Sequence, residues 1–257
     1  RGVEVIQQPD TLLSLESLNV RVQAWPLLKG KVEVDDVTLS QVAVNSANLI
    51  EGMQIKGVLG RFFLQSHGVD LSNETAVVNR TELSDTHIQL LMTDTTTTPK
   101  DTTASAPVNW KVNLHQLKLK NVSFGMKLPA DSMKMAAYIG EATIDDAKAD
   151  LKNQFYGLKQ FLLSGASASY DTGEAQPSEG FDASHMAVRN IRIGLDSLLY
   201  EGRNMNAVIR EITMEERSGL SITSLTGRLF SNDSIIRIPE LKLQTPHSEI
   251  DLSAQTY

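Results

Sequence analysis

The stretch LKLKNVSFGMKLP, residues 117 to 129, decides the fold class because its apolar residues alternate, slip by one position and then alternate again. With h for an apolar residue and x for any residue, it contains h-x-h-x-x-h-x-h at Leu117, Leu119, Val122 and Phe124. On a helix that advances about 100° per residue these positions form no single face. On a β-strand each half lines one face, and a bulge at the central pair restores the phase.

This pattern, called the slip template below, recurs along the chain and predicts a mainly-β fold. The strong copies lie at Leu13, Leu15, Leu18 and Val20; Val37, Leu39, Val42 and Val44; Met186, Val188, Ile191 and Ile193; and Ile236, Ile238, Leu241 and Leu243. Weaker copies use small residues, at Ala142, Ile144, Ala147 and Ala149, and at Ala207, Ile209, Ile212 and Met214.

A two-residue hairpin at the central pair of the template is the alternative interpretation. Such turns need positive φ, usually from Gly or Asn. The central pairs are Ser40-Gln41, Lys120-Asn121, Arg189-Asn190 and Pro239-Glu240, and proline cannot adopt positive φ. We therefore predict long bulged strands. Because a bulge bends its strand, bulges repeated at similar depth predict a curved sheet.

The chain divides at two segments that are poor in large apolar residues. Residues 93 to 108 are Thr-rich and predict a disordered linker or loop, and residues 171 to 184 predict a second, shorter loop. We expect one β segment at residues 1 to 92 and its continuation at residues 109 to 257. Helix signals are few; the best is a turn around WPLLKG, where Pro26 suits a first helical position and Gly30 a stop.

Composition excludes several function classes. The net charge of −7 and the scattered Lys and Arg residues give no footprint for nucleic acid. The chain has no cysteine, and its isolated histidines fit surface or loop positions better than metal sites: His67, His87, His115, His185 and His247. The pairs Asp35-Asp36 and Asp145-Asp146 fit solvated bulges better than acid–base catalysis. We therefore expect neither an enzyme nor a cofactor. The first residue is Arg1, so we expect that a signal peptide or anchor can precede it.

Two longer stretches resemble the TamB and AsmA-like family. Residues 9 to 44 contain a strand ending in VRV, a PLLKGK turn and a second strand of VEVDDVTL type. Residues 214 to 229, MEERSGLSITSLTGRL, and residues 238 to 252, IPELKLQTPHSEIDL, resemble a TamB-like stretch in which E-x-S-G-L precedes strands ending in a T-P-x-S turn. The resemblance covers most of the chain except the Thr-rich segment.

The resemblance implies a repeat-built, largely antiparallel sheet that forms an open half-pipe with an apolar inner face, as in bridge-like lipid-transfer proteins. It implies a periplasmic segment of a gram-negative protein that a preceding N-terminal helix anchors in the inner membrane. It also implies an outer-membrane barrel partner of the TamA/BamA type, bound through parts of the protein beyond these residues. Phospholipid acyl chains would then be the ligand of the groove.

Three functions remain open from the sequence. The first is shielding of lipid acyl chains for phospholipid transport between the two membranes, with Lys118, Lys120 and Arg192 outside the groove. The second is a scaffold or chaperone for outer-membrane protein assembly and autotransporter secretion, in which sheet edges engage client strands. The third is a closed β-sandwich. The groove candidates are the template residues Val37, Leu39, Val42, Val44, Leu117, Leu119, Val122, Phe124, Met186, Val188, Ile191, Ile193, Ile236, Ile238, Leu241 and Leu243.

Overall fold

The computed structural model describes residues 3–7, 10–22, 31–32, 34–46, 52–70, 73–92, 109–173 and 175–256. Its strands are β1 (Val3–Gln7), β2 (Asp10–Val22), β3 (Lys31–Val32), β4 (Val34–Asn45), β5 (Met53–Asp70), β6 (Thr75–Met92), β7 (Lys111–Leu128), β8 (Met133–Asp150), β9 (Phe155–Leu158), β10 (Gln160–Asp171), β11 (His185–Glu201), β12 (Asn204–Glu216), β13 (Ser221–Ser231), β14 (Ile236–Gln244) and β15 (Glu249–Thr256). A 3₁₀ turn, η1 (Pro129–Asp131), joins β7 to β8.

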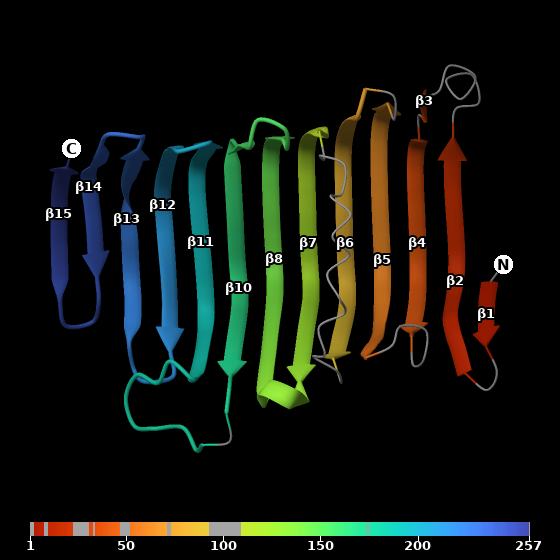
Figure 1. The fold of residues 1–257 in the computed structure, drawn as a ribbon, viewed down its shortest axis with the longest axis horizontal. Coiled ribbons are helices and arrows are strands. Elements are labelled where there is room, and N and C mark those ends of the chain that lie inside the picture. Colours follow the sequence, from red (N-terminus) through yellow and green to blue (C-terminus); the bar gives the residue numbers. More distant parts are fainter. Residues whose placement is uncertain are drawn as a thin grey trace, which may run out of the picture.

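All fifteen strands belong to one sheet, in the order β1-β2-β4-β5-β6-β7-β8-β10-β11-β12-β13-β14-β15 (Figure 1). The short β3 pairs with β5, and β9 pairs with β8 and β11. The pairs are antiparallel except for β6 and β7, which run parallel. The structure thus confirms the mainly-β, largely antiparallel fold. The described strands form no second sheet, so the closed β-sandwich is not the architecture of this part of the chain.

Every copy of the slip template lies inside one continuous strand. The copies fall in β2, β4, β7, β8, β11, β12 and β14, and each strand runs through its central pair without a turn. The prediction of long continuous strands is therefore confirmed, and the hairpin alternative is wrong. The predicted bulge appears as a register shift at the central pairs of β11, β12 and β14, whereas β7 and β8 pair with each other without a shift. The two acidic pairs differ. Residues 34 and 36 of β4 pair with consecutive residues of β2, which makes Asp35 an inserted residue, whereas β8 pairs with β7 through Asp145-Asp146 without a register shift.

Positive φ at a central pair does not imply a hairpin in this sheet. Central residues of four templates do adopt positive φ, although their strands continue: Gln41 (51°), Asn121 (55°), Asp146 (51°) and Asn190 (54°). Asn and Asp tolerate this left-handed conformation because their short polar side chains can hydrogen-bond locally. At Pro239-Glu240 the bulge forms differently, as a shift in register between Ile238 and Leu241. Positive φ therefore marks the bulge in part of the sheet.

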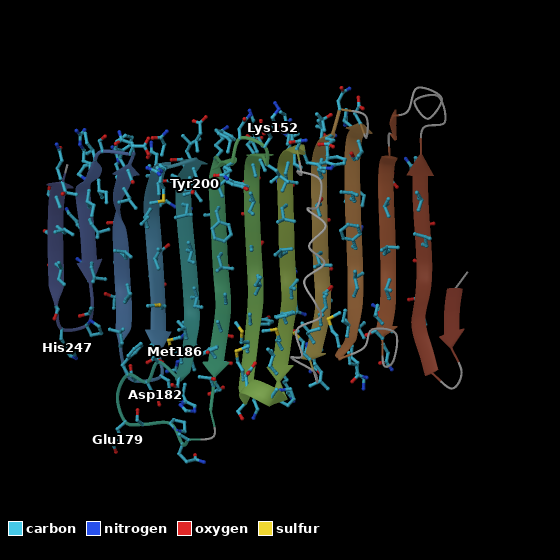
Figure 2. All side chains as sticks on the ribbon, viewed as in Figure 1. Lys152, Glu179, Asp182, Met186, Tyr200 and His247 are labelled. Atoms are coloured by element: carbon cyan, nitrogen blue, oxygen red, sulfur yellow. The ribbon has the colours of Figure 1, made fainter. Side chains whose placement is uncertain are left out.

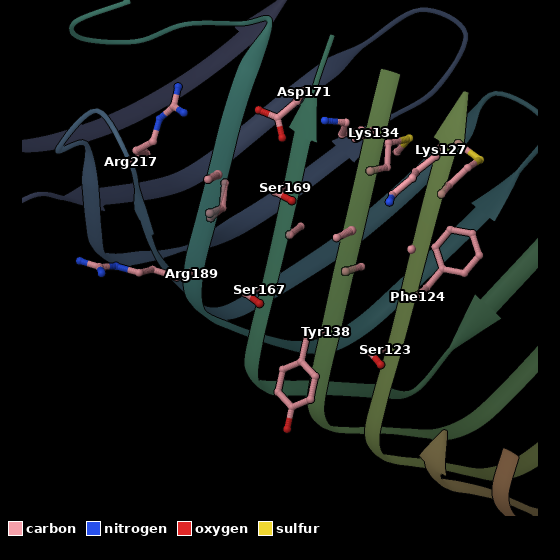
Figure 3. A pocket seen from close by; sticks show the side chains of 18 of the residues that line it. Ser123, Phe124, Lys127, Lys134, Tyr138, Ser167, Ser169, Asp171, Arg189 and Arg217 are labelled. Atoms are coloured by element: carbon pink, nitrogen blue, oxygen red, sulfur yellow. The ribbon is translucent and has the colours of Figure 1, made fainter. Parts of the chain in front are cut away.

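Six neighbouring strands each place one residue in a row that crosses the sheet, which we call the crease. Register pairs on both sides of the row place one residue of each strand in it: Gln41, Gly60, Asp85, Asn121, Gly140 and Gly165. Residues with positive φ alternate with glycines along most of this row. Figure 3 shows the strands bending beside Tyr138 and Ser167, which lie two residues from the crease.

Hydrogen bonds between side chains tie the strands together at the crease. Asn121 Nδ2 donates to Asp85 Oδ1 at 2.8 Å, and Tyr138 donates its hydroxyl proton to Asn121 Oδ1 at 3.2 Å. Each such bond stabilises a fold by about 0.5–1.5 kcal/mol net. The central residues of the templates thus do more than bend the strands, because their polar side chains also fix which strands meet.

The parallel pair β6–β7 has a consequence for the Thr-rich segment. Parallel neighbours need a connection that returns along the sheet. Residues 93 to 108 lie within that connection in sequence, between Met92 and Lys111, and they lie outside the described residues. The expected turn at Pro26 and Gly30 lies outside them as well. The two β segments expected on either side of the Thr-rich segment join directly through β6 and β7.

Candidate functional site

Register brings the groove candidates next to other apolar residues on one face of the sheet. Residues directly opposite each other across antiparallel strands point to the same face. Leu117 pairs with Ile144, and Val122 with Ile139. The other candidates that pair with apolar residues do so as follows: Val37 with Leu64, Leu39 with Phe62, Val42 with Leu59, Leu119 with Ala142, Phe124 with Ala137, Val188 with Ala168, Ile191 with Ala166, Ile193 with Leu163, Leu241 with Leu252 and Leu243 with Ile250.

Val44 and Ile238 also have apolar partners, Leu13 and Ala254. The two remaining candidates pair otherwise, Met186 with Tyr170 and Ile236 with Ser231 and Thr256. All four lie on the strands that carry the other candidates, β4, β11 and β14. The template therefore identifies one side of the sheet.

The exposure of these residues lies between that of a core and that of a surface. Of the candidates only Val42 is buried, at 7% exposed, whereas Phe124 and Ile236 are 41% and 48% exposed. The others are half-buried. Lys118, Lys120 and Arg192, which alternate with them, are exposed. Apolar side chains that neighbours on the same sheet cover only in part remain available for contact with a ligand.

A pocket of about 1200 Å³ lies along one end of the sheet, between β5 and the turn that follows β12. It lies at the end of the strands that carries Asp182 and Met186, opposite the end with Lys152 and Tyr200 (Figure 2). Its apolar lining includes two groove candidates, Phe124 and Val188, and further residues on their strands and neighbours: Leu90, Met126, Met135, Ala137 and Ala168. Register places this apolar set on one face, since Leu90 lies beside Met126, Met126 opposite Met135, and Phe124 opposite Ala137.

The same pocket carries polar and charged side chains that alternate with the apolar ones (Figure 3). Lys127 follows Met126 on β7, and Lys134 precedes Met135 on β8. Ser123, Tyr138 and Ser167 line the pocket close to the crease. Because successive residues of a strand point to opposite faces, these polar side chains lie on the face opposite the apolar set, and the pocket is lined by residues of both faces.

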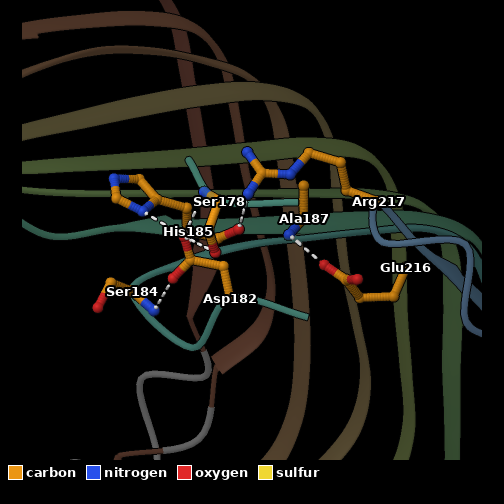
Figure 4. Close-up of polar contacts among 7 residues, drawn as sticks. All are labelled: Ser178, Asp182, Ser184, His185, Ala187, Glu216 and Arg217. Atoms are coloured by element: carbon orange, nitrogen blue, oxygen red, sulfur yellow. Dashed lines mark hydrogen bonds and ion pairs between the residues drawn. The ribbon is translucent and has the colours of Figure 1, made fainter. Parts of the chain in front are cut away.

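A cluster of polar groups lies beside β11 and β12, and three of its residues, Ala187, Glu216 and Arg217, line the pocket (Figure 4). Asp182 is its centre: its Oδ2 accepts hydrogen bonds from the Ser178 backbone N–H at 2.9 Å, and Oδ1 accepts from the Ser184 backbone N–H at 2.9 Å. The His185 Nδ1 lies 3.0 Å from Asp182 Oδ2. His185 is buried, at 6% exposed, so the expectation of a surface position fails for this histidine because the 172–184 loop covers it.

Glu216 and Arg217 extend the cluster to β12. Glu216 accepts hydrogen bonds from the backbone N–H groups of Ala187 at 3.2 Å and Ser218 at 2.6 Å. These bonds to Ser218 hold the pKa of the Glu216 carboxyl below its usual value. Arg217 donates to the backbone oxygen of His185. Both side chains line the pocket and are already engaged with the protein.

The Asp182 cluster predicts that the 172–184 loop loosens in acid. Hydrogen bonds from the backbone N–H groups of Ser178 and Ser184 hold the Asp182 pKa far below its usual value of about 3.9. A depressed pKa contributes stability above the unfolded value that is lost as pH falls through the folded one. We expect hydrogen exchange at these two amides to accelerate, after correction for the intrinsic rate, as pH falls below about 4.

Two variants test this acid effect. Asp182→Ala should give fast exchange at both amides at every pH, because the acceptor is gone. Glu179→Ala changes an exposed carboxylate of the same loop and should behave as wild type. Protection at Ser178 and Ser184 that is independent of pH in the wild-type protein would contradict this role of Asp182.

The described residues hold no cluster of three or more His, Asp or Glu side chains that could bind a metal ion. Their one helical element is η1, and nothing among them has the length and apolar character of a membrane-crossing helix. No protein-family model matches the sequence, and no curated protein does.

Sequence reasoning missed several residues of the pocket. Met126 could have been predicted from the sequence, because it continues the alternation of Val122 and Phe124 by one step. Lys127 and Lys134 could not be paired from the sequence, because their register depends on the η1 turn between them. Leu90 comes from a parallel neighbour that lies far away in the sequence, so no local pattern pointed to it.

Proposed function

We propose that this chain is a segment of a TamB/AsmA-like protein that shields lipid acyl chains along the apolar face of its sheet, for phospholipid transport between inner and outer membranes. One observation carries the proposal: the template residues of neighbouring strands share one face of a single sheet, and most of them are half-buried. A second sheet would bury them fully. A hydrocarbon chain laid along this face would remove further apolar surface from water at about 25 cal/mol per Å².

The size of the pocket supports a long ligand. Sites for small molecules have volumes of roughly 300–1,000 Å³. The pocket exceeds that range at about 1200 Å³, and it extends across β6, β7, β8, β10 and β11. Its apolar residues, which include Phe124, Met126 and Met135, match the hydrocarbon part of such a ligand.

The remaining parts of the proposal follow from the resemblance. We infer that the protein acts in the periplasm, that an N-terminal helix preceding these residues anchors it in the inner membrane, and that it reaches an outer-membrane barrel of the TamA/BamA type through other parts of the protein. The proposal assigns no catalytic step, no cofactor and no nucleic-acid partner to these residues.

Among the described residues β15 is the last strand of the sheet, and its exposure favours a second candidate, a scaffold for outer-membrane protein assembly. Every residue of β15 is exposed, and Ile250 and Leu252 are 53% and 42% exposed. An edge strand with exposed apolar side chains can pair with the strand of a client protein. Pairing would use the backbone of β15, whereas the first candidate uses the apolar face.

The experiment that tests the first candidate is extraction of lipid from the purified protein. We expect protein isolated without harsh detergent to carry phospholipid, detected by mass spectrometry. Shielding is worth about 0.8 kcal/mol per CH₂, so coverage of part of one acyl chain survives gentle handling. Lipid-free protein that also fails to take up phospholipid from vesicles would rule out the groove and leave the edge-strand candidate.

A further inference from the structure

Methionine is concentrated at one end of the sheet. The chain has eight methionines, and seven of them lie toward the end of the strands that carries Asp182 (Figure 2). We call these seven the methionine rim: Met53, Met92, Met126, Met133, Met135, Met186 and Met214. The eighth, Met205, is the register partner of Tyr200, which lies at the opposite end.

Register places the methionine rim on one face of the sheet, the face of the groove candidates. Met126 is opposite Met135, and Phe124, two residues before Met126, is opposite Ala137. The other members connect to these pairs as follows: Leu90 lies beside Met126, Met53 opposite Met92, Leu128 opposite Met133, Tyr170 opposite both Met135 and Met186, and Ile212, two residues before Met214, opposite Ile193. Residues two positions apart in a regular strand share a face, so the rim shares the face of Phe124.

The side chains of the methionine rim are open to a ligand. Met135 is 39% exposed, and the other six are half-buried. Methionine is among the residue types most often found fully buried, so seven partly exposed methionines in one place are unusual for a surface that faces only water. A hydrocarbon ligand would cover apolar surface that the protein itself leaves in contact with solvent.

The face around the rim carries almost no charge. Lys127 and Lys134 are adjacent in sequence to rim methionines, so alternation puts them on the other face. At this end of the described strands one charged residue is in register with the apolar face, Glu216, which is opposite Val188. Its carboxylate already accepts hydrogen bonds from backbone N–H groups, including that of Ala187. The rim therefore suits an uncharged, apolar part of a ligand.

Methionine makes this part of the face more adaptable than the middle of the strands. Its side chain is unbranched, with three rotatable bonds and a polarisable sulfur, so it can fill irregular gaps. Toward the middle, the same face carries side chains that are branched at Cβ and therefore stiffer: Ile139, Ile144, Ile191 and Ile193. Surfaces rich in methionine accept ligands of several shapes because they can repack.

We propose that the methionine rim binds the bent, cis-unsaturated acyl chains of phospholipids as readily as straight chains. This inference rests on the proposed function and names the class of hydrocarbon that the groove accepts at this end. A cis double bond puts a fixed bend in an acyl chain, and a stiff surface leaves gaps beside the bend. Atoms that border a gap lose their dispersion contacts, which lowers affinity. Methionine side chains rearrange and close such gaps.

The test compares two phosphatidylcholines that differ only in the shape of their chains. Dioleoyl-phosphatidylcholine has a cis double bond in each chain, whereas dielaidoyl-phosphatidylcholine has the trans isomer, which is nearly straight. The protein is incubated with vesicles that hold equal amounts of both lipids, one of them deuterated. Lipid extracted from the re-isolated protein is then measured by mass spectrometry. We expect the wild-type protein to take up the two isomers in nearly equal amounts.

Replacing two rim methionines with isoleucine should create a preference for the straight chain. The variant Met126→Ile/Met135→Ile keeps apolar side chains with the same number of heavy atoms and removes their flexibility. We expect this variant to take up the trans isomer over the cis isomer by about threefold or more, because contacts at the bend are lost. The total amount of bound lipid should change little.

Met205→Ile is the matched control, because it makes the same exchange on the same face at the opposite end. It should leave the ratio of the isomers at the wild-type value, and thermal unfolding checks that both variants are folded. Three results would overturn the role of the rim and leave the proposed groove intact: a strong preference of the wild-type protein for one isomer, nearly equal uptake by the double variant, or an equal change in Met205→Ile. Uptake of neither isomer by the wild-type protein would contradict the groove as well.

Discussion

Replacing Gly60 with alanine is expected to destabilise the protein by about 1–3 kcal/mol, the range of an overpacked interior site. A Cβ at this position would lie 2.5 Å from the backbone oxygen of Asp85 and 2.8 Å from its Cβ. Backbone atoms of a neighbouring strand cannot rotate away as a side chain can, so β5 and β6 would have to separate at the crease. Urea unfolding measures the effect as a lower midpoint for Gly60→Ala.

Gly125→Ala provides the control for this prediction. Gly125 also lies inside a strand, β7, but the atoms nearest to a Cβ there are 3.8 Å and 4.0 Å away. Alanine loses less conformational freedom on folding than glycine does, so we expect Gly125→Ala to be neutral or to stabilise by about 0.4–1 kcal/mol. Equal destabilisation by the two substitutions would mean that glycine at the crease has no special role.

Most of the fold could be predicted from the sequence because the slip template is a local signal. The positions of Leu119 and Val122 on either side of Lys120-Asn121 exclude a helix and predict a strand whose alternation resets at that pair. What local signals could not supply is the alignment of bulges between strands. The crease depends on register, and register between Asp85 and Asn121 depends on a parallel pairing across a segment that carries no apolar pattern.

In the candidate site, too, some features follow from local sequence signals and others depend on the register between strands. The template located the apolar face, including Phe124 and Val188, because alternation within a strand decides which side chains share a face. The charged part of the pocket is assembled from pairs such as Lys127 and Lys134 that belong to different strands. Single charges in a sequence are common, and only the register shows which of them lie side by side.

Replacing Leu119 with aspartate is expected to leave the protein folded and to remove much of its bound lipid. Leu119 lies next to the crease, half-buried, with Leu83 and Ala142 as register partners. Inside a closed core this change would cost about 2–3 kcal/mol of burial and also strand a charge, which threatens a fold stable by about 5–15 kcal/mol. On one open face of a single sheet the carboxylate can reach water.

Two quantities are measured for this variant, the melting temperature and the bound phospholipid, and we expect the substitution to lower the second far more than the first. The melting temperature of Leu119→Asp should fall modestly, and phospholipid extracted per protein should fall clearly, because a carboxylate on the face repels hydrocarbon. Lys118→Asp alters the neighbouring exposed residue, which alternation places on the opposite face, and should change neither quantity. An unfolded Leu119→Asp protein would mean that the face is closed in solution, and a folded one with undiminished lipid would mean that acyl chains lie elsewhere.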